Sequence, residues 1–118
     1  MFRIKRIYAP PVPEDGFRIL VDGLWPRGLS KDAAAIDVWV KDIAPSRELR
    51  QWFDHDRERW QEFAIRYRQE LKATARASAL DLLRQQEREK GTVTLLFAAR
   101  DERHNHAVVL HGLLRGQP

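Results

Sequence analysis

Residues 92–98, with the sequence TVTLLFA, decide the fold that we predict for this chain. The run has the length of a strand and is almost wholly apolar, which is typical of a strand buried on both faces. Before it, residues 74–90 carry apolar side chains at helical spacing, and Gly91 fits the position that ends a helix. After it, residues 104–115 repeat a helical pattern. A long helical segment before the buried strand favours an α/β fold, because parallel strands need such crossovers.

Three further strands are predicted upstream of the buried one. Residues 2–8 mix apolar and basic side chains, residues 17–21 are mostly apolar, and residues 36–43 alternate with a period of two. Residues 22–35 between the last two are predicted to form a loop. We therefore predict a compact single α/β domain over residues 1–118, with a small, largely parallel sheet flanked by helices. The direction of the first strand pair stays open, because its connection is short for a parallel crossover.

The composition is that of a globular protein. Hydrophobic residues make up 43% and charged residues 32% of the sequence, and its length fits one domain. It contains no cysteine, which excludes disulfides and thiolate chemistry. We find no apolar run of signal-peptide length at the N-terminus, and no stretch of the roughly 20 apolar residues that a membrane span requires. We expect a cytoplasmic protein that has no membrane partner.

A net charge of +4 and a pI of about 9.8 permit an anionic partner. Nucleic acid is one such partner, and one helical segment is rich in arginine: Arg47, Arg50, Arg57, Arg59, Arg66 and Arg68. Acidic residues are interleaved with these arginines, and no helix-turn-helix pattern is found. A nucleic-acid-binding or regulatory module is therefore our alternative hypothesis. The four tryptophans leave two assembly states open, a monomer with all four in one core and a homodimer that covers exposed aromatic surface.

A polar motif, DGLWPRG over residues 22–28, follows the predicted strand of residues 17–21. In open α/β sheets, ligands bind beyond the carboxyl ends of the strands, and the strand places Asp22 and Arg27 there. The Arg27 guanidinium offers a planar set of five donors that suits phosphate or carboxylate. The alternative is a structural turn, in which Trp25 covers the core and Asp22 pairs with Arg27 on the surface.

A second polar motif, RDERHNHAVVL over residues 100–110, follows the buried strand and runs into the last predicted helix. The N-terminus of a helix favours anions, and a histidine there is suited to acid or base chemistry near neutral pH. Two alternatives are structural: Asn105 or Asp101 caps the helix, and His106 is a hydrogen-bonded residue under the loop. A shared metal requires His104 to lie outside the helix, because residues two apart on a helix do not face each other.

Three blocks of the sequence resemble the YeaO-like branch of domain-of-unknown-function family 488: VDGLWPRGLSK, WVKDIAPSRELRQWF and LLFAARDERHNHAVVL. The match extends from Ile4 to about Leu114, and the three blocks in this order are highly specific. The resemblance implies a compact α/β fold with a largely parallel sheet, in bacterial cytoplasmic proteins, and no particular activity. Carried over residue by residue, it singles out Asp22, Trp25, Pro26, Arg27, Asn105 and His106, and more weakly His104.

One position departs from the family pattern. The first block usually reads DRLWPRG in the family, and here Gly23 stands where the arginine is found. The resemblance therefore implies that a ligand site would lose one positive charge, and Lys31, Lys41 and Arg100 are the candidate replacements.

Together, the two motifs predict a site for an anion or a phosphate-bearing small molecule at the carboxyl edge of the sheet. We leave open whether this site is enzymatic. The candidate catalytic pair is Asp22 and His106, with His106 as the general acid or base and Asp22 orienting it. The candidate ligand-binding residues are Trp25, Arg27, His104 and Asn105. We expect no cofactor and no metal.

Overall fold

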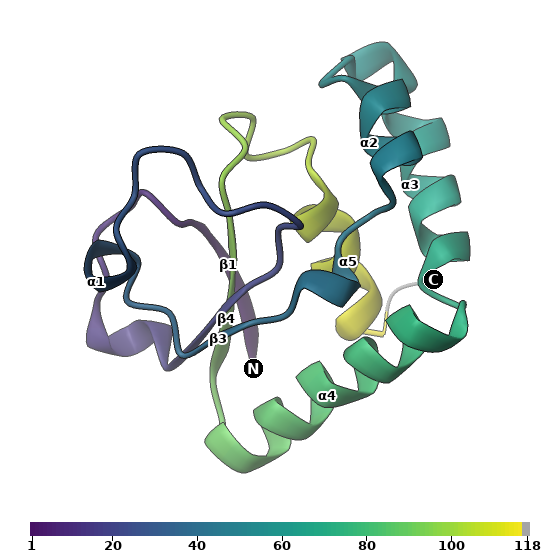
Figure 1. Ribbon diagram of the computed structural model, residues 1–118. Coiled ribbons are helices and arrows are strands. Elements are labelled where there is room, and N and C mark those ends of the chain that lie inside the picture. The colour runs from purple at the N-terminus through teal and green to yellow at the C-terminus, as the bar shows by residue number, and fades with distance from the viewer. Residues whose placement is uncertain (117–118) are drawn as a thin grey trace.

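The computed structural model describes residues 1–116 and places the strand formed from TVTLLFA inside a four-stranded sheet (Figure 1). The strand order is β1-β4-β2-β3 and every pairing is parallel. The strands are β1 (Phe2–Arg6), β2 (Phe17–Leu20), β3 (Val38–Trp39) and β4 (Val93–Phe97). The predicted α/β fold with a parallel sheet is confirmed. The first two strands, whose relative direction the sequence left open, are parallel and separated by β4.

Helices account for most of the remaining chain. Within residues 1–116 they are α1 (Lys31–Ala34), α2 (Arg47–Phe53), α3 (Trp60–Glu70), α4 (Thr74–Lys90) and α5 (His106–Leu114). Short 3-10 helices cover Pro13–Asp15, Lys41–Ile43 and Arg57–Arg59. The predicted helix over residues 74–90 is confirmed at both ends. None of the described helices is long and apolar enough to cross a membrane.

Both faces of the sheet are covered, and by different kinds of structure. Val93, Leu95 and Phe97 of β4 face the larger core, to which α2 to α5 contribute. Leu96 points to the opposite face, where a smaller core forms with Trp39 of β3 and with three residues of the segment between β2 and β3, namely Trp25, Leu29 and Ile36. Figure 1 shows α1 on one side of the sheet and α2 to α5 on the other. This double cover explains why all five residues of β4 are buried and apolar or, at Thr94, hydrogen-bonded.

The strand predicted over residues 36–43 is much shorter in the structure. Only Val38–Trp39 pairs with β2, and Lys41–Ile43 forms a 3-10 helix. The alternating pattern was misleading because Trp39 points into the smaller core, where its indole donates a hydrogen bond to the Asp22 carbonyl at 2.7 Å. Burial of irregular segments gives the same alternation of apolar and polar residues as a strand.

The loop predicted over residues 22–35 contains the short helix α1. Ser30 is the N-cap of this helix, because its hydroxyl accepts a hydrogen bond from the Ala33 amide at 3.1 Å. The helix ends at Ala35, which adopts a left-handed conformation. One turn of helix leaves no amphipathic periodicity in the sequence, so this element was not recognisable.

A buried ion pair lies on the side of the smaller core. Arg18 Nη1 is 2.5 Å from Asp15 Oδ2, and Lys5 Nζ lies 3.0 Å from the same oxygen. The other two guanidinium nitrogens of Arg18 donate to backbone carbonyls, Nη2 to that of Ala34 and Nε to that of Ala35. Asp15 is 1% and Arg18 5% exposed. We call Lys5, Asp15 and Arg18 the paired cluster.

Candidate functional site

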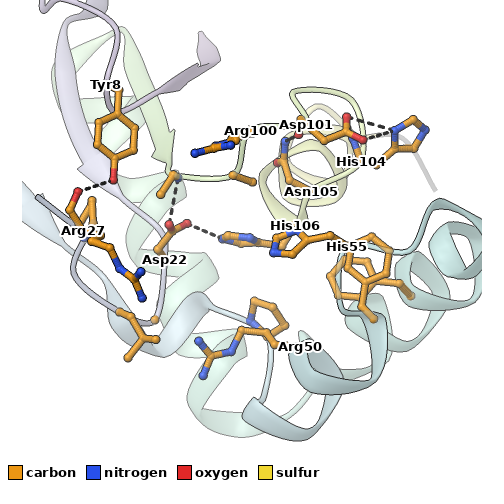
Figure 2. Close-up of a pocket in the computed structure, with 18 of the residues that line it drawn as sticks. Tyr8, Asp22, Arg27, Arg50, His55, Arg100, Asp101, His104, Asn105 and His106 are labelled. Carbon is orange, nitrogen blue, oxygen red and sulfur yellow. Dashed lines mark hydrogen bonds and ion pairs between the residues drawn. The ribbon is translucent and has the colours of Figure 1, made fainter.

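A cavity of about 840 Å³ lies beyond the carboxyl ends of β2 and β4 (Figure 2). One wall comes from the segment after β2 and another from the segment between β4 and α5. A third wall comes from α2, the turn that follows it and the start of α3. The volume is within the range of small-molecule sites in proteins. Its lining includes Tyr8, Asp22, Gly23, Leu24, Trp25, Pro26, Arg27, Arg50, Phe53, His55, Arg57, Phe63, Arg100, Asp101, His104, Asn105 and His106.

The structure brings all the sequence-predicted site residues to this one cavity: Asp22, Trp25, Arg27, His104, Asn105 and His106. They meet because β2 and β4 are adjacent and parallel, so that the segments following them leave the sheet at the same edge. The proposed surface pair of Asp22 with Arg27 is wrong. Asp22 instead pairs with His106, and the distance between Asp22 Oδ1 and His106 Nε2 is 3.3 Å.

The Asp22–His106 pair joins three elements. The second carboxylate oxygen of Asp22 accepts the Ala98 amide at 3.0 Å, which ties the end of β2 to the end of β4. His106 Nε2 also lies 3.1 Å from the Val21 carbonyl oxygen. Both neighbours of Nε2 are acceptors, so this nitrogen carries the proton. The pair therefore holds the first turn of α5 against the strand ends.

Burial acts on both members of this pair. It raises the pKa of Asp22, and three groups oppose the change: the His106 ring when it is protonated, the Ala98 amide and the Arg50 guanidinium. Burial also lowers the pKa of His106, although the nearby Asp22 carboxylate acts to raise it. The arrangement favours a neutral imidazole at neutral pH, with its Nε2 proton directed at Asp22 and Val21.

Asn105 is the N-cap of α5. Its side-chain oxygen accepts the Val108 amide at 3.2 Å, and its side-chain nitrogen donates to the Asp101 carbonyl at 2.9 Å. The residue is 3% exposed. The capping alternative is thus correct for Asn105, and both polar ends of its amide are occupied by the backbone.

His104 belongs to a separate pair at the rim. Its Nδ1 lies 3.0 Å from Asp101 Oδ2, and Arg57 Nε approaches the same oxygen at 3.1 Å. The Arg103 amide and His104 lower the pKa of Asp101 to about 2. The two histidines of the second motif are therefore turned to different carboxylates. Among the described residues, no three His, Asp or Glu side chains are grouped as metal ligands.

Three arginines on the cavity wall differ from Arg57 in having no carboxylate partner within residues 1–116: Arg27, Arg50 and Arg100. We call them the open cluster. In Figure 2, the Arg27 and Arg50 side chains extend on one side of the Asp22–His106 pair and Arg100 lies on the other. Arg50 Nε is buried and makes no hydrogen bond in the described part of the chain. Unpartnered guanidinium groups on a concave wall favour an anionic occupant.

The sequence named Arg50 only as one of the arginines of a helical segment, and not as a residue of the site. Among the candidate replacements for the arginine absent at Gly23, Arg100 lines the cavity and the two lysines do not. Arg50 lies closer to that position, since a Cβ atom added at Gly23 would be 3.4 Å from Arg50 Nη1. The available signal was its spacing: Arg50 precedes the buried Phe53 by three residues on α2 and so shares its side of the helix.

The rest of the wall is largely apolar. Phe53 and Phe63 stack with their ring centres 4.3 Å apart, and Leu24, 69% exposed, lies at the cavity. His55 also lines the cavity and contacts the Phe53 ring. It arrives there because Asp54 and His55 both adopt left-handed backbone conformations after α2, which are uncommon for residues other than glycine.

Trp25 and Tyr8 fix the loop that carries Arg27. The Trp25 indole donates to the Leu29 carbonyl at 2.6 Å and packs edge-on against Trp39. The Tyr8 hydroxyl donates to the Arg27 carbonyl at 2.8 Å. The backbone of the loop is thus held from both sides, while the Arg27 side chain remains exposed.

The fold and cavity define an α/β protein with a parallel sheet and a basic, partly aromatic hollow at the strand ends. The chain belongs to the family described as the inactive DUF488-N3 subclade, whose model matches residues 1–117. A Mycobacterium tuberculosis protein, Rv3073c, is 43% identical over 115 residues, covering 98% of this chain and 94% of the relative. Escherichia coli YeaO is 41% identical over 120 residues, covering 94% of each chain. No solved structure matches the chain significantly.

The comparisons confirm the resemblance to the YeaO-like proteins that the three sequence blocks carry. Both relatives bear the name of uncharacterized proteins, so they add no ligand and no reaction. Any function has to be argued from the cavity.

Proposed function

We propose that this chain binds an anionic small molecule, of which a phosphate compound is the simplest case, in the cavity beyond β2 and β4. One observation carries the proposal: the cavity wall holds Arg27, Arg50 and Arg100, and none of them has a carboxylate partner within residues 1–116. Guanidinium groups bind phosphate oxygens through paired hydrogen bonds, and a partly enclosed site screens their charge less than bulk water does.

The apolar part of the wall narrows the ligand class. Trp25, Phe53 and Phe63 contribute aromatic surface to the same cavity. Sites with a few convergent charges among apolar side chains bind molecules that have an uncharged body as well as an acidic group. We therefore propose an organic anion rather than an inorganic ion as the natural ligand, with inorganic phosphate as a usable probe.

We propose binding without turnover. Asp22 Oδ2 accepts the Ala98 amide, and His106 Nε2 faces both the Val21 carbonyl and Asp22 Oδ1, which itself accepts no hydrogen bond within residues 1–116. These contacts hold β2, β4 and α5 together. A general acid or base needs a free position within hydrogen-bond reach of the ligand. His106 Nε2 faces the Asp22 and Val21 oxygens and offers no such position. The family description, inactive, supports the same conclusion. Asp22 and His106 then serve to position the cavity wall.

A thermal-shift series with phosphate, pyrophosphate and sulfate tests the proposal. A ligand at 100 times its dissociation constant stabilises the folded chain by about 2.7 kcal/mol. We expect this stabilisation in the wild type and its loss in Arg27→Ala. Arg88→Ala is the matched control, because Arg88 is an exposed arginine on α4 that does not line the cavity. Stabilisation by no anion, or equal stabilisation of Arg27→Ala and wild type, would refute it.

Oligonucleotide retention by wild type and arginine variants tests the alternative hypothesis of nucleic-acid binding. Binding through phosphates of a nucleic acid weakens steeply as salt rises, with a slope set by the number of contacts. Retention of an oligonucleotide that depends on Arg59 and Arg66 rather than on Arg27 would favour the alternative hypothesis over a small-molecule site.

A further inference from the structure

A second, smaller cavity adjoins the first. Its volume is about 250 Å³, and it shares Gly23, Pro45 and Arg50 with the larger one. It lies between the 3-10 helix of Lys41–Ile43, the start of α2 and the start of α4. The two cavities thus meet at Arg50, whose side chain forms part of both walls.

The second cavity is strongly basic. Lys41, Arg47, Arg50 and Arg76 line it against a single carboxylate, Asp42. Arg76 donates its Nε proton to the Ala44 carbonyl at 2.9 Å, and Lys41 Nζ lies 4.1 Å from the centre of the Trp39 ring. None of the four forms an ion pair within residues 1–116. The excess positive charge is therefore available to an anion.

Gly23 stands at the junction of the cavities. Its φ is not positive, so its backbone does not require glycine. A Cβ atom at this position would lie 3.3 Å from Ala44 Cβ and 3.4 Å from Arg50 Nη1. A side chain larger than alanine would therefore press against Arg50 or fill the junction. Because Gly23 has no side chain, nothing from this position occupies the junction of the two cavities.

We propose that the ligand of this protein carries two separate anionic groups and spans both cavities. One group contacts Arg27 and Arg100 in the larger cavity. The other enters the smaller cavity, where Lys41 and Arg47 face it, and Arg50 at the junction contacts both groups. The ligand class is then a bisphosphate, an oligophosphate ester or a comparable molecule with two separate anionic groups, rather than a monophosphate. This inference rests on the proposed function, because it adds a second subsite to the same site.

Calorimetric titration of phosphate, pyrophosphate and tripolyphosphate at physiological ionic strength tests the inference. The proteins are wild type, Lys41→Gln/Arg47→Gln and the control Arg88→Gln; Lys41, Arg47 and Arg88 are all exposed. We expect wild type to bind tripolyphosphate at least about tenfold more tightly than phosphate, the effect of one added charged contact. The double variant should lose this gain and keep its phosphate affinity, whereas Arg88→Gln should keep both.

The outcomes separate the inference from the proposed function. If the double variant binds tripolyphosphate as tightly as wild type, the second subsite is wrong, and Arg27-dependent phosphate binding still supports the first. If the double variant loses tripolyphosphate affinity while Arg27→Ala binds phosphate as tightly as wild type, the anion binds in the smaller cavity alone, and both the spanning ligand and the proposed function are wrong. If wild type binds none of the three anions, both are wrong.

Discussion

The paired cluster and the open cluster contain similar side chains in opposite states. In the paired cluster, Asp15 accepts from Arg18 and Lys5, and the rest of the Arg18 guanidinium is bonded to backbone carbonyls. In the open cluster, Arg27, Arg50 and Arg100 line a cavity of about 840 Å³ and have no carboxylate partner within residues 1–116.

This difference shows how to assign roles to charged residues. A buried charge that is fully matched within the chain leaves nothing for a ligand, and removing its partner destabilises the fold because the remaining charge is left uncompensated. Cationic groups on a concave wall that lack partners repel one another, and an anion relieves this repulsion. The paired cluster should therefore respond to mutation through the stability of the fold, and the open cluster through ligand binding.

The largest effect is expected from breaking the paired cluster with Asp15→Asn. Removing one member of a buried ion pair leaves the other charge uncompensated and typically costs about 3–5 kcal/mol. Burial acts to raise the pKa of Asp15, but the Val12 amide, Lys5 and Arg18 together lower it, so the carboxylate is charged in the folded state. Urea denaturation followed by circular dichroism measures the change. Glu14→Gln, at an exposed neighbour, is the control that should keep wild-type stability.

An intermediate effect is expected from the pH dependence of His106. Burial places the pKa of His106 in the folded chain below the ordinary value of about 6.5. On acidification the unfolded chain takes up this proton first, so the free energy of unfolding falls as pH drops below about 6.5. Asp22 has the opposite sign, because its raised pKa lets the folded chain take up its proton first.

Denaturation curves of wild type and His106→Gln between about pH 7.5 and 5.5 test this titration, since the window brackets the pKa of free histidine. Wild type should lose more stability than the variant across the window. An equal loss in His106→Gln and wild type would show that burial does not govern this histidine.

The smallest effect on stability is expected in the open cluster. Arg27 and Arg100 are exposed, and neither side chain makes a hydrogen bond within residues 1–116. Surface substitutions of this kind change the free energy of unfolding by less than about 0.5 kcal/mol. Arg27→Ala and Arg100→Ala should therefore unfold at the wild-type urea midpoint in the absence of anions. A loss of several kcal/mol in either would mean that the open cluster is structural.

The fold could be predicted where side-chain periodicity extended over a full element. β4 and α4 were identified because an apolar run and a long amphipathic pattern have few alternative explanations. β3 was predicted too long, over residues 36–43, and α1 was not identified, because two to four residues carry too little periodicity. The strand order β1-β4-β2-β3 could not be predicted either, because strand pairing depends on contacts between segments that are distant in the sequence.

The site could be predicted in part for a similar reason. Asp22 and His106 directly follow strands that are adjacent in the sheet, so their approach follows from parallel pairing. Arg50 could not be found in this way, because α2 reaches the cavity only through the packing of helices on the larger core. The role of Asn105 as a cap was one of the alternatives that the sequence contained.

The most direct test of the account compares the two clusters within one molecule. Pyrophosphate is titrated into ¹⁵N-labelled protein, and the amide chemical shifts are followed by two-dimensional NMR. We predict saturable changes at Gly23, Arg27 and Arg100 and unchanged signals at Asp15 and Arg18, with the changes lost in Arg27→Ala. Absence of any change, or changes of equal size at the two clusters, would contradict the claim that the open cluster is an anion site.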